Sequence, residues 1–246
     1  MPDRPPLLVL NPAHDPAGLA RGYAAQQRLQ IRDVLTAESA RLIRDILRLD
    51  TAWGLAWQAG SHGPNLWRER EVKAASAGAG RDEAERLIGA AAGGDGYAFA
   101  YSAYPMLTAY LERWDSGSAQ DQLLEELNSP PMLDFVRRVT GIGEIVKADA
   151  QATLYAPGQF LAMHDDAEPS RGRRVAYVLN LCATDWRPDW GGYLNFYDDA
   201  GDVVAGYRPR FNALNLFTVP QPHNVTYVPP FAPVARFAIT GWFRDR

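Results

Sequence analysis

Residues 147–166 read KADAQATLYAPGQFLAMHDD, two β-prone runs on either side of the turn Ala156-Pro157-Gly158. Proline pre-sets the first central position of such a turn, and glycine accepts positive φ at the next. Short β-rich runs continue to the C-terminus between Pro, Gly and Asp clusters, a spacing typical of an antiparallel sandwich or barrel. We expect eight strands, the number that a two-sheet jelly roll needs. They are residues 147–155, 159–164, 174–181, 193–197, 203–207, 213–217, 223–228 and 235–243.

The first half of the chain is predicted to be mainly helical. Thr36 is a suitable N-cap, and apolar residues then recur at helical spacing, which predicts a helix over 37–49. Further helices are expected at 82–92, 118–127 and 131–140. The predicted fold class is therefore α+β. Residues 146–246 would form a double-stranded β-helix (jelly roll) core, and residues 1–145 would supply a helical layer and the first strands. Because the chain shows no repeat and no long linker, a single domain over 1–246 is expected.

Composition narrows the function. The 246 residues are 47% hydrophobic, which is ordinary for a globular protein, and 25 Lys plus Arg against 29 Asp plus Glu give a net charge of -4. That balance disfavours nucleic acid as a partner. The single cysteine, Cys182, cannot form an internal disulfide, so a cytoplasmic protein is expected. No apolar run approaches the roughly 20 residues of a membrane span, so neither membrane insertion nor secretion is expected.

Two histidines and one aspartate form a candidate metal site. In an extended backbone, residues i and i+2 share a face, so His164 and Asp166 can offer an imidazole nitrogen and a carboxylate oxygen to one metal ion. Taken alone, such a triplet is more often an exposed polar turn. His223 opens a later β-prone run, where a surface or core histidine is the usual finding. The chain has only four histidines, however, and His164 and His223 are the two in its β-rich half.

Arg236 lies in the β-prone run 235–243, where alternation places it on one face with Ala238, Thr240 and Trp242. Both faces of this run are largely apolar, so the strand is expected to be covered on both sides. A buried guanidinium needs a partner. That partner is either an anionic ligand gripped through two parallel hydrogen bonds or an internal Asp or Glu.

At these residues the chain resembles the 2-oxoglutarate/Fe(II) oxygenase superfamily, whose pattern is His-x-Asp, a distant His, and an Arg or Lys about ten residues beyond. The pattern here is His164-x-Asp166, His223 and Arg236. Residues 155–164 resemble the strand-turn-strand that precedes the metal ligands in the prolyl hydroxylase branch, and residues 177–181, 189–194, 209–225 and 29–38 resemble other segments of the superfamily. Two features depart from that branch: Arg236 stands where collagen-type enzymes have Lys, and it follows His223 by thirteen residues.

The resemblance implies a role for each of these residues. His164, Asp166 and His223 would be the catalytic metal ligands, and Arg236, Tyr155 and Thr240 would bind the co-substrate. Fe(II), 2-oxoglutarate and O2 are implied, with ascorbate as a stimulant. The implied reaction is hydroxylation of a prolyl residue in a protein or peptide, with succinate and CO2 as co-products.

Several alternatives stay open. A small-molecule or free-amino-acid hydroxylase would use the same chemistry, and a jelly roll without turnover would be a binding module. Buried Asn180 and Asn212 are expected to satisfy backbone groups rather than to orient ligands. The aromatic run 97–105 either lines the pocket or packs in the core, and Trp186 and Trp190 form either a lid or a cap on the barrel end. No feature of the sequence indicates an oligomeric state.

Overall fold

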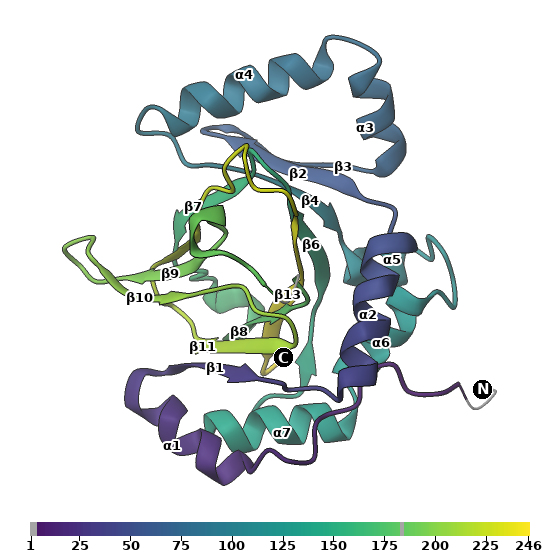
Figure 1. Cartoon of the computed structure of the whole chain (residues 1–246), viewed down its shortest axis with the longest axis vertical. Coiled ribbons are helices and arrows are strands. Elements are labelled where there is room, and N and C mark those ends of the chain that lie inside the picture. The colour runs from purple at the N-terminus through teal and green to yellow at the C-terminus, as the bar shows by residue number, and fades with distance from the viewer. Residues whose placement is uncertain (1–3, 183–184) are drawn as a thin grey trace.

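The computed structural model describes residues 4–182 and 185–246, which form a nearly closed antiparallel barrel with helices outside it (Figure 1). The helices in these ranges are α1 (Pro16–Gln26), α2 (Ala37–Leu49), α3 (Glu69–Ser76), α4 (Gly80–Ala92), α5 (Met106–Leu111), α6 (Ala119–Leu127) and α7 (Pro130–Thr140). The strands are β1 (Arg28–Arg32), β2 (Gly54–Ala59), β3 (His62–Trp67), β4 (Ala98–Tyr104), β5 (Lys147–Ala148), β6 (Gln151–Tyr155), β7 (Phe160–His164), β8 (Arg173–Asn180), β9 (Leu194–Tyr197), β10 (Val203–Tyr207), β11 (Ala213–Thr218), β12 (His223–Val225) and β13 (Arg236–Arg244).

The sheet follows the path β1-β11-β8-β13-β6-β4-β7-β12-β9-β10, and β2, β3 and β5 branch from it. Helices α1 and α7 lie beneath β1, α2, α5 and α6 lie beside the barrel, and α3 and α4 cross above β2 and β3 (Figure 1). The predicted α+β class with a double-stranded β-helix core is confirmed. Strand β13 sits between β6 and β8 in this path, so it is a central strand, as expected.

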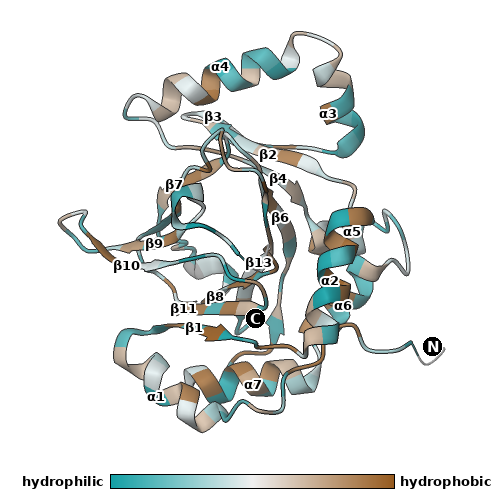
Figure 2. Ribbon diagram, viewed as in Figure 1, coloured by the Kyte–Doolittle hydropathy of each residue, from teal (hydrophilic) through white to brown (hydrophobic). Residues whose placement is uncertain are grey.

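Alternation along the strands separates two apolar cores. On β8, Tyr177 and Leu179 pack with the helices in the main core, whereas Ala176 and Val178 point into the barrel. This follows from the two-residue period of an extended chain. Figure 2 shows the matching pattern on the outside, where hydrophobic residues recur between hydrophilic ones along α4 and α7. Burial on both faces fixes the register of the central strands.

Most predicted elements are present, with shifted ends. Helix α2 has the predicted bounds, and the side chain of its N-cap Thr36 accepts a hydrogen bond from the backbone N–H of Ser39. Ser118 caps α6 in the same way, through the backbone N–H of Asp121. Helices α4 and α7 begin slightly earlier than predicted.

Two predicted strands were wrong in extent. The run 147–155 is divided into β5 and β6, because the side chain of Asp149 accepts a 2.7 Å hydrogen bond from the backbone N–H of Trp242 and interrupts the ladder. The run 223–228 ends as a strand at Val225. Beyond it, the backbone N–H of Thr226 bonds to Tyr193 rather than continuing the pairing with β7.

The first half contains more β-structure than expected. The β2–β3 hairpin was not predicted, and β4 joins it to the barrel by pairing with both β6 and β7. Helices α1, α3 and α5 were also missed. Strand β3 contains Gly63, Pro64 and Asn65, residue types that are depleted in strands, so pairing with β2 rather than intrinsic propensity holds it. No helix in the described part of the chain has both the length and the apolar character needed to cross a membrane.

Candidate metal centre

His164 and His223 lie directly opposite one another on neighbouring strands. His164 is the last residue of β7 and His223 the first of β12, and the two are partners in the antiparallel register. Opposed residues of such a pair have their Cβ atoms about 4.5–5.5 Å apart. The ring centroids here are 4.2 Å apart. Strand pairing therefore brings together two imidazoles that are far apart in the sequence.

Asp166 joins them through a turn rather than through an extended strand. Strand β7 ends at His164, and Asp166 has a left-handed backbone with φ of 61°. The expectation that strand alternation aligns His164 with Asp166 was therefore wrong in its geometry. The carboxylate still converges on both rings, with Oδ1 3.4 Å from Nε2 of His164 and Oδ2 3.5 Å from Nε2 of His223. Aspartate is one of the few non-glycine residues that tolerate this conformation.

Backbone carbonyls orient both imidazoles. Nδ1 of His164 lies 3.0 Å from the carbonyl oxygen of Ala162, and Nδ1 of His223 lies 2.8 Å from that of Gln221. A carbonyl oxygen only accepts, so each Nδ1 carries a proton, and the Nε2 atoms of both rings face the carboxylate of Asp166. Histidine ligands are typically held in this way by a partner on the other ring nitrogen.

The pKa values of the three groups reflect their mutual contact. Burial acts to raise the pKa of Asp166, but the two imidazoles outweigh it and the pKa lies below its ordinary value. Burial acts to lower the pKa of His164, and the hydrogen bond to Asp166 reverses that effect and raises it. For His223, burial and then the neighbouring His164 lower the pKa to about 4. Asp166 is thus ionised and His223 neutral at pH 7, the protonation states that metal ligands require, whereas contact with Asp166 shifts His164 toward its protonated form.

The three residues fit the donor set of a mononuclear iron site. Their ligand atoms all lie within 4.8 Å of one another, and among the described residues they form the one such His/Cys/Asp/Glu group. Two imidazoles and one carboxylate on one side of a metal leave further positions open, which is the pattern of non-haem Fe(II) oxygenases rather than of a closed structural site.

Arg236 lies in the same pocket with little to neutralise its charge. Its side chain is on the central strand β13, is 1% exposed, and donates one hydrogen bond of 3.2 Å to Oδ1 of Asn180. Its Nε has no partner, and no carboxylate of the described residues forms an ion pair with it. Burial lowers its pKa from the ordinary value. The alternative of an internal Asp or Glu partner therefore finds no support, and an anionic ligand would complete the site.

The pocket that holds these groups has a volume of about 190 Å³. Tyr155 and Thr240 both line it, as do Tyr97 and Tyr101 of the aromatic run 97–105. The ring of Tyr155 stacks on Tyr101 at 5.1 Å and lies under the guanidinium of Arg236 at 5.2 Å. The structure thus places all six predicted site residues around one cavity.

The two buried asparagines have different hydrogen-bond partners. Asn212 accepts a hydrogen bond from the backbone N–H of Leu35 and donates one to its carbonyl, so it satisfies backbone groups as expected. Asn180 donates to the backbone carbonyls of Val178 and Ala213, but its Oδ1 also holds Arg236. Asn180 therefore positions the guanidinium as well.

Trp186 and Trp190 do not line the metal pocket. They contact each other edge to face at 5.6 Å, and the indole N–H of Trp186 donates to the carbonyl of Gly191. This supports the barrel-cap interpretation rather than the lid. Gln151 was not predicted as a pocket residue, yet it lines the pocket, because alternation along β6 puts it on the same face as Tyr155.

Comparisons with known proteins agree with this geometry. Residues 150–244 match the family model described as the 2OG-Fe(II) oxygenase superfamily. A search of the curated proteins found no match. A Pseudomonas putida prolyl-4-hydroxylase structure is 21% identical, with a TM-score of 0.56 over 94% of this chain and 100% of that one. A 2OG-Fe(II) oxygenase family oxidoreductase from Burkholderia pseudomallei is 12% identical, with a TM-score of 0.62 over 99% and 97%.

A third solved structure with this fold is the non-haem α-ketoglutarate-dependent epimerase SnoN from nogalamycin biosynthesis. It is 13% identical, with a TM-score of 0.57 over 94% of this chain and 84% of that one. At these identities the structures establish a shared fold. The family match covers residues 150–244, and this segment contains His164, Asp166 and His223, so this part of the chain is similar in sequence to the 2OG-Fe(II) oxygenase superfamily.

Proposed function

We propose that this protein is a 2-oxoglutarate- and Fe(II)-dependent dioxygenase that hydroxylates a prolyl residue of a protein or peptide and releases succinate and CO2. One observation carries the proposal. Three metal-ligand side chains and a buried arginine without a carboxylate partner share one cavity. The three ligand side chains alone would suit any metal ion, and the buried arginine alone would suit any anion. In one pocket they suit a metal ion together with an organic acid.

His164, Asp166 and His223 would hold the metal, and their ligand atoms already lie within 4.8 Å of one another. When bound, Fe(II) would supply the activation of O2, coupled to decarboxylation of 2-oxoglutarate. The chain supplies orientation. The hydrogen bonds from each Nδ1 to a backbone carbonyl prevent ring rotation, and the neutral state of His223 keeps its Nε2 free of a proton.

Arg236 would bind the far carboxylate of 2-oxoglutarate, because a guanidinium grips a carboxylate through two parallel hydrogen bonds. Asn180 holds it in place from one side, and the ring of Tyr155 lies against it from the other. The hydroxyl groups of Tyr155 and Thr240, both on the pocket wall, would complete the polar contacts. The geometry favours a dicarboxylate that spans from the metal ligands to β13.

The size of the cavity bears on the substrate. About 190 Å³ is below the 300–1,000 Å³ typical of pockets that enclose a drug-sized ligand. With a co-substrate inside, the remaining space suits one small side chain presented from outside. Apolar groups such as Phe99, Leu161 and Val225 line it, and they would exclude water and suit a pyrrolidine ring. These features support a prolyl residue in a polypeptide over a free molecule enclosed whole.

The proposal is tested by turnover. Purified protein with Fe(II), ascorbate, 2-oxoglutarate and a proline-rich peptide library should form succinate and add 16 Da to a prolyl residue. His164→Ala and Asp166→Ala should abolish both signals, and His62→Ala, an exposed histidine outside the pocket, should leave both unchanged. Equal turnover in either ligand variant would refute the assignment of the metal site.

The small-molecule alternative has its own outcome in the same assay. Succinate formation that is stimulated by free L-proline or another small molecule, and by no peptide, would replace the prolyl-peptide proposal and keep the chemistry. The binding-module alternative predicts that Fe(II) and 2-oxoglutarate both fail to bind in calorimetry.

A further inference from the structure

Asp166 lies in a segment between β7 and β8 that no strand pairing holds. Strand β7 ends at His164 and β8 begins at Arg173, and Asp166 has a left-handed backbone. Within this segment, the backbone N–H of Ala167 donates a 2.9 Å hydrogen bond to the side chain of Asp165. That bond is local and ties the segment to no other element. Because a metal ligand has to stay within about 0.5 Å of its productive position, other contacts have to hold Asp166.

Glu168 connects this segment to Arg173. It lies two residues beyond Asp166, and its carboxylate is 3.3 Å from a terminal nitrogen of Arg173 and 2.7 Å from Nε of Arg171. The pair with Arg171 is exposed, and exposed ion pairs contribute little. The side chain of Arg173 is only 13% exposed, so solvent screens its pair with Glu168 less. Glu168 is therefore attached to the first residue of β8.

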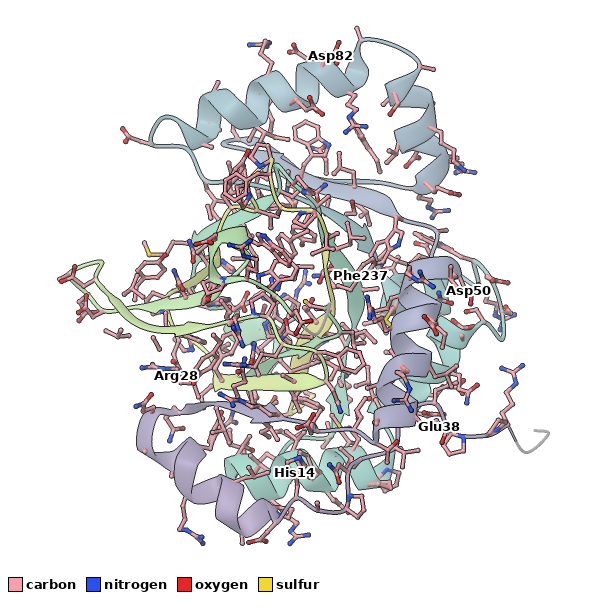
Figure 3. All side chains as sticks on the ribbon, viewed as in Figure 1. His14, Arg28, Glu38, Asp50, Asp82 and Phe237 are labelled. Atoms are coloured by element: carbon pink, nitrogen blue, oxygen red, sulfur yellow. The ribbon has the colours of Figure 1, made fainter. Side chains whose placement is uncertain are left out.

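Arg173 in turn lies over the ring of Trp242 on β13. Its guanidinium carbon is 3.6 Å from the centre of that ring, well within the range of a cation–π contact. Strand β13 crosses the middle of the molecule, where Figure 3 labels Phe237. We call Glu168, Arg173 and Trp242 the clamp. The clamp joins the segment that bears Asp166 to a central strand of the sheet.

The indole N–H of Trp242 is an unused donor beside Asp166. Both residues line the metal pocket. Nε1 of Trp242 is buried and has no acceptor in hydrogen-bond geometry among the described residues, although a buried indole N–H usually finds a partner. Burial acts to raise the pKa of Asp166, and after the two imidazoles the indole N–H of Trp242 acts to lower it. The N–H thus faces the carboxylate without closing a hydrogen bond to it.

We propose that Arg173 and Trp242 position the carboxylate of Asp166 for the metal ion, an inference that rests on the proposed function. Arg173 holds the segment through Glu168 and fixes the plane of the indole by lying over it. Trp242 would then present its N–H to a carboxylate oxygen that a metal ion leaves free. Losing a contact that orients a metal ligand typically weakens metal binding by about 10–100-fold. A clamp that served stability alone would leave the metal affinity of the folded protein unchanged.

The test uses the metal-free full chain and Mn(II) alone, with affinity measured by isothermal titration calorimetry. Arg173→Ala should weaken Mn(II) binding by about 10–100-fold. Arg173→Lys keeps the charge but not the planar fork, so it should recover part of that affinity. Trp242→Phe keeps an aromatic ring for Arg173 and removes the N–H, so it should weaken binding by about tenfold.

Bound Co(II) gives a readout that a purely structural role would not change. Its visible absorption bands depend on how the ligands are arranged around the metal. They should shift in Trp242→Phe, because the carboxylate of Asp166 loses its donor and changes its orientation. A folded variant that has lost only stability should keep the bands of wild type.

Arg68 supplies a matched control. Its guanidinium carbon is 3.7 Å from the ring centre of Trp114, and it pairs with Glu112 at 2.7 Å. Arg68→Ala therefore loses the same two kinds of contact, at residues that do not line the metal pocket, and it should bind Mn(II) as wild type does. Melting followed by circular dichroism checks that each variant is folded at the titration temperature. If Arg173→Ala does not fold, Trp242→Phe carries the test.

Equal Mn(II) affinities in Arg173→Ala, Trp242→Phe and Arg68→Ala, with unshifted Co(II) bands, overturn the proposal. So does a loss of affinity in Arg68→Ala as large as in Arg173→Ala, because it would show a general effect of stability on binding. If wild type itself fails to bind Mn(II), the metal site and the proposed function are refuted together with this inference. The failure of the clamp and the failure of the metal site are therefore distinguishable.

Discussion

Replacing Arg236 by methionine should abolish 2-oxoglutarate binding without destabilising the metal-free protein. The guanidinium is 1% exposed and donates its one hydrogen bond to Asn180. If the charge is retained for an anionic ligand, the protein alone gains little from it. If Arg236 were instead kept for stability, its replacement would greatly lower the unfolding free energy.

Three contributions determine whether Arg236→Met lowers or raises the unfolding free energy. Burying an ion in a real protein costs several kcal/mol after relaxation. Against this, the position of Arg236 over Tyr155 contributes about 1 kcal/mol. Losing the donor to Asn180 leaves a buried acceptor unsatisfied, at about 1–3 kcal/mol. Methionine fills a similar volume with no charge, so the unfolding free energy should stay within about 1 kcal/mol of wild type or rise.

Urea unfolding followed by tryptophan fluorescence measures that free energy, and thermal shift with Mn(II) measures binding. At a 2-oxoglutarate concentration of about 100 Kd, binding should raise the unfolding free energy of wild type by about 2.7 kcal/mol. For a chain of this size, this raises Tm by roughly 5–10 °C. 2-Oxoglutarate should not raise the Tm of Arg236→Met. It should raise the Tm of Arg138→Met, a control at an exposed site, as much as that of wild type. If Arg236→Met loses more than about 3 kcal/mol of unfolding free energy, Arg236 is kept for stability. If the variant keeps the 2-oxoglutarate shift, Arg236 does not bind the co-substrate.

Other positions give contrasting expectations. Asn212→Ala should lower the unfolding free energy by about 2–3 kcal/mol through two lost buried hydrogen bonds with KM for 2-oxoglutarate unchanged, whereas Asn180→Ala should raise that KM. Gly191 has φ of 60° and ψ of -146°, and a Cβ there would overlap a backbone carbonyl. Gly191→Ala should therefore cost about 3 kcal/mol or more in urea unfolding, while Gly89→Ala, in open space inside α4, should gain about 0.5–1 kcal/mol. Burial raises the pKa of Asp149, so its folded form binds more protons than its unfolded form near that pKa. The stability of wild type relative to Asp149→Asn should rise as pH falls from 7 toward 4, and an opposite slope would contradict the burial effect.

The β-rich half was largely predictable from the sequence, because each strand there obeys a local rule. In β8 and β13, apolar residues fill both faces between clear turn signals, so burial on both sides follows from the sequence alone. In β2 and β3 the local signals are weak: β3 contains glycine, proline and asparagine, and pairing with β4 through β2 holds it in place. Such long-range pairing leaves no periodic trace for a sequence argument to detect.

The candidate site was predictable in its members but not in its geometry. His164, His223 and Arg236 were found from residue type, order and strand phase. The turn that brings Asp166 to the histidines depends on one left-handed residue, which strand alternation does not foresee. The role of Asn180 was also hidden, because only the register between β8 and β13 shows that an asparagine lies within reach of the arginine.

Three departures from local rules meet in one cavity. Asp166 has a left-handed backbone, Arg236 is a buried cation without a carboxylate partner, and His223 is buried with its pKa lowered to about 4. Departures from local rules that occur together are expected where function requires them. Each departure here is relieved by adding the same two components. A divalent cation satisfies Asp166 and the lone pairs of His164 and His223, and a dicarboxylate satisfies Arg236. Because one pair of ligands resolves all of these otherwise unrelated irregularities, the cavity is better explained as a site for a metal and an organic acid than as packing imperfections.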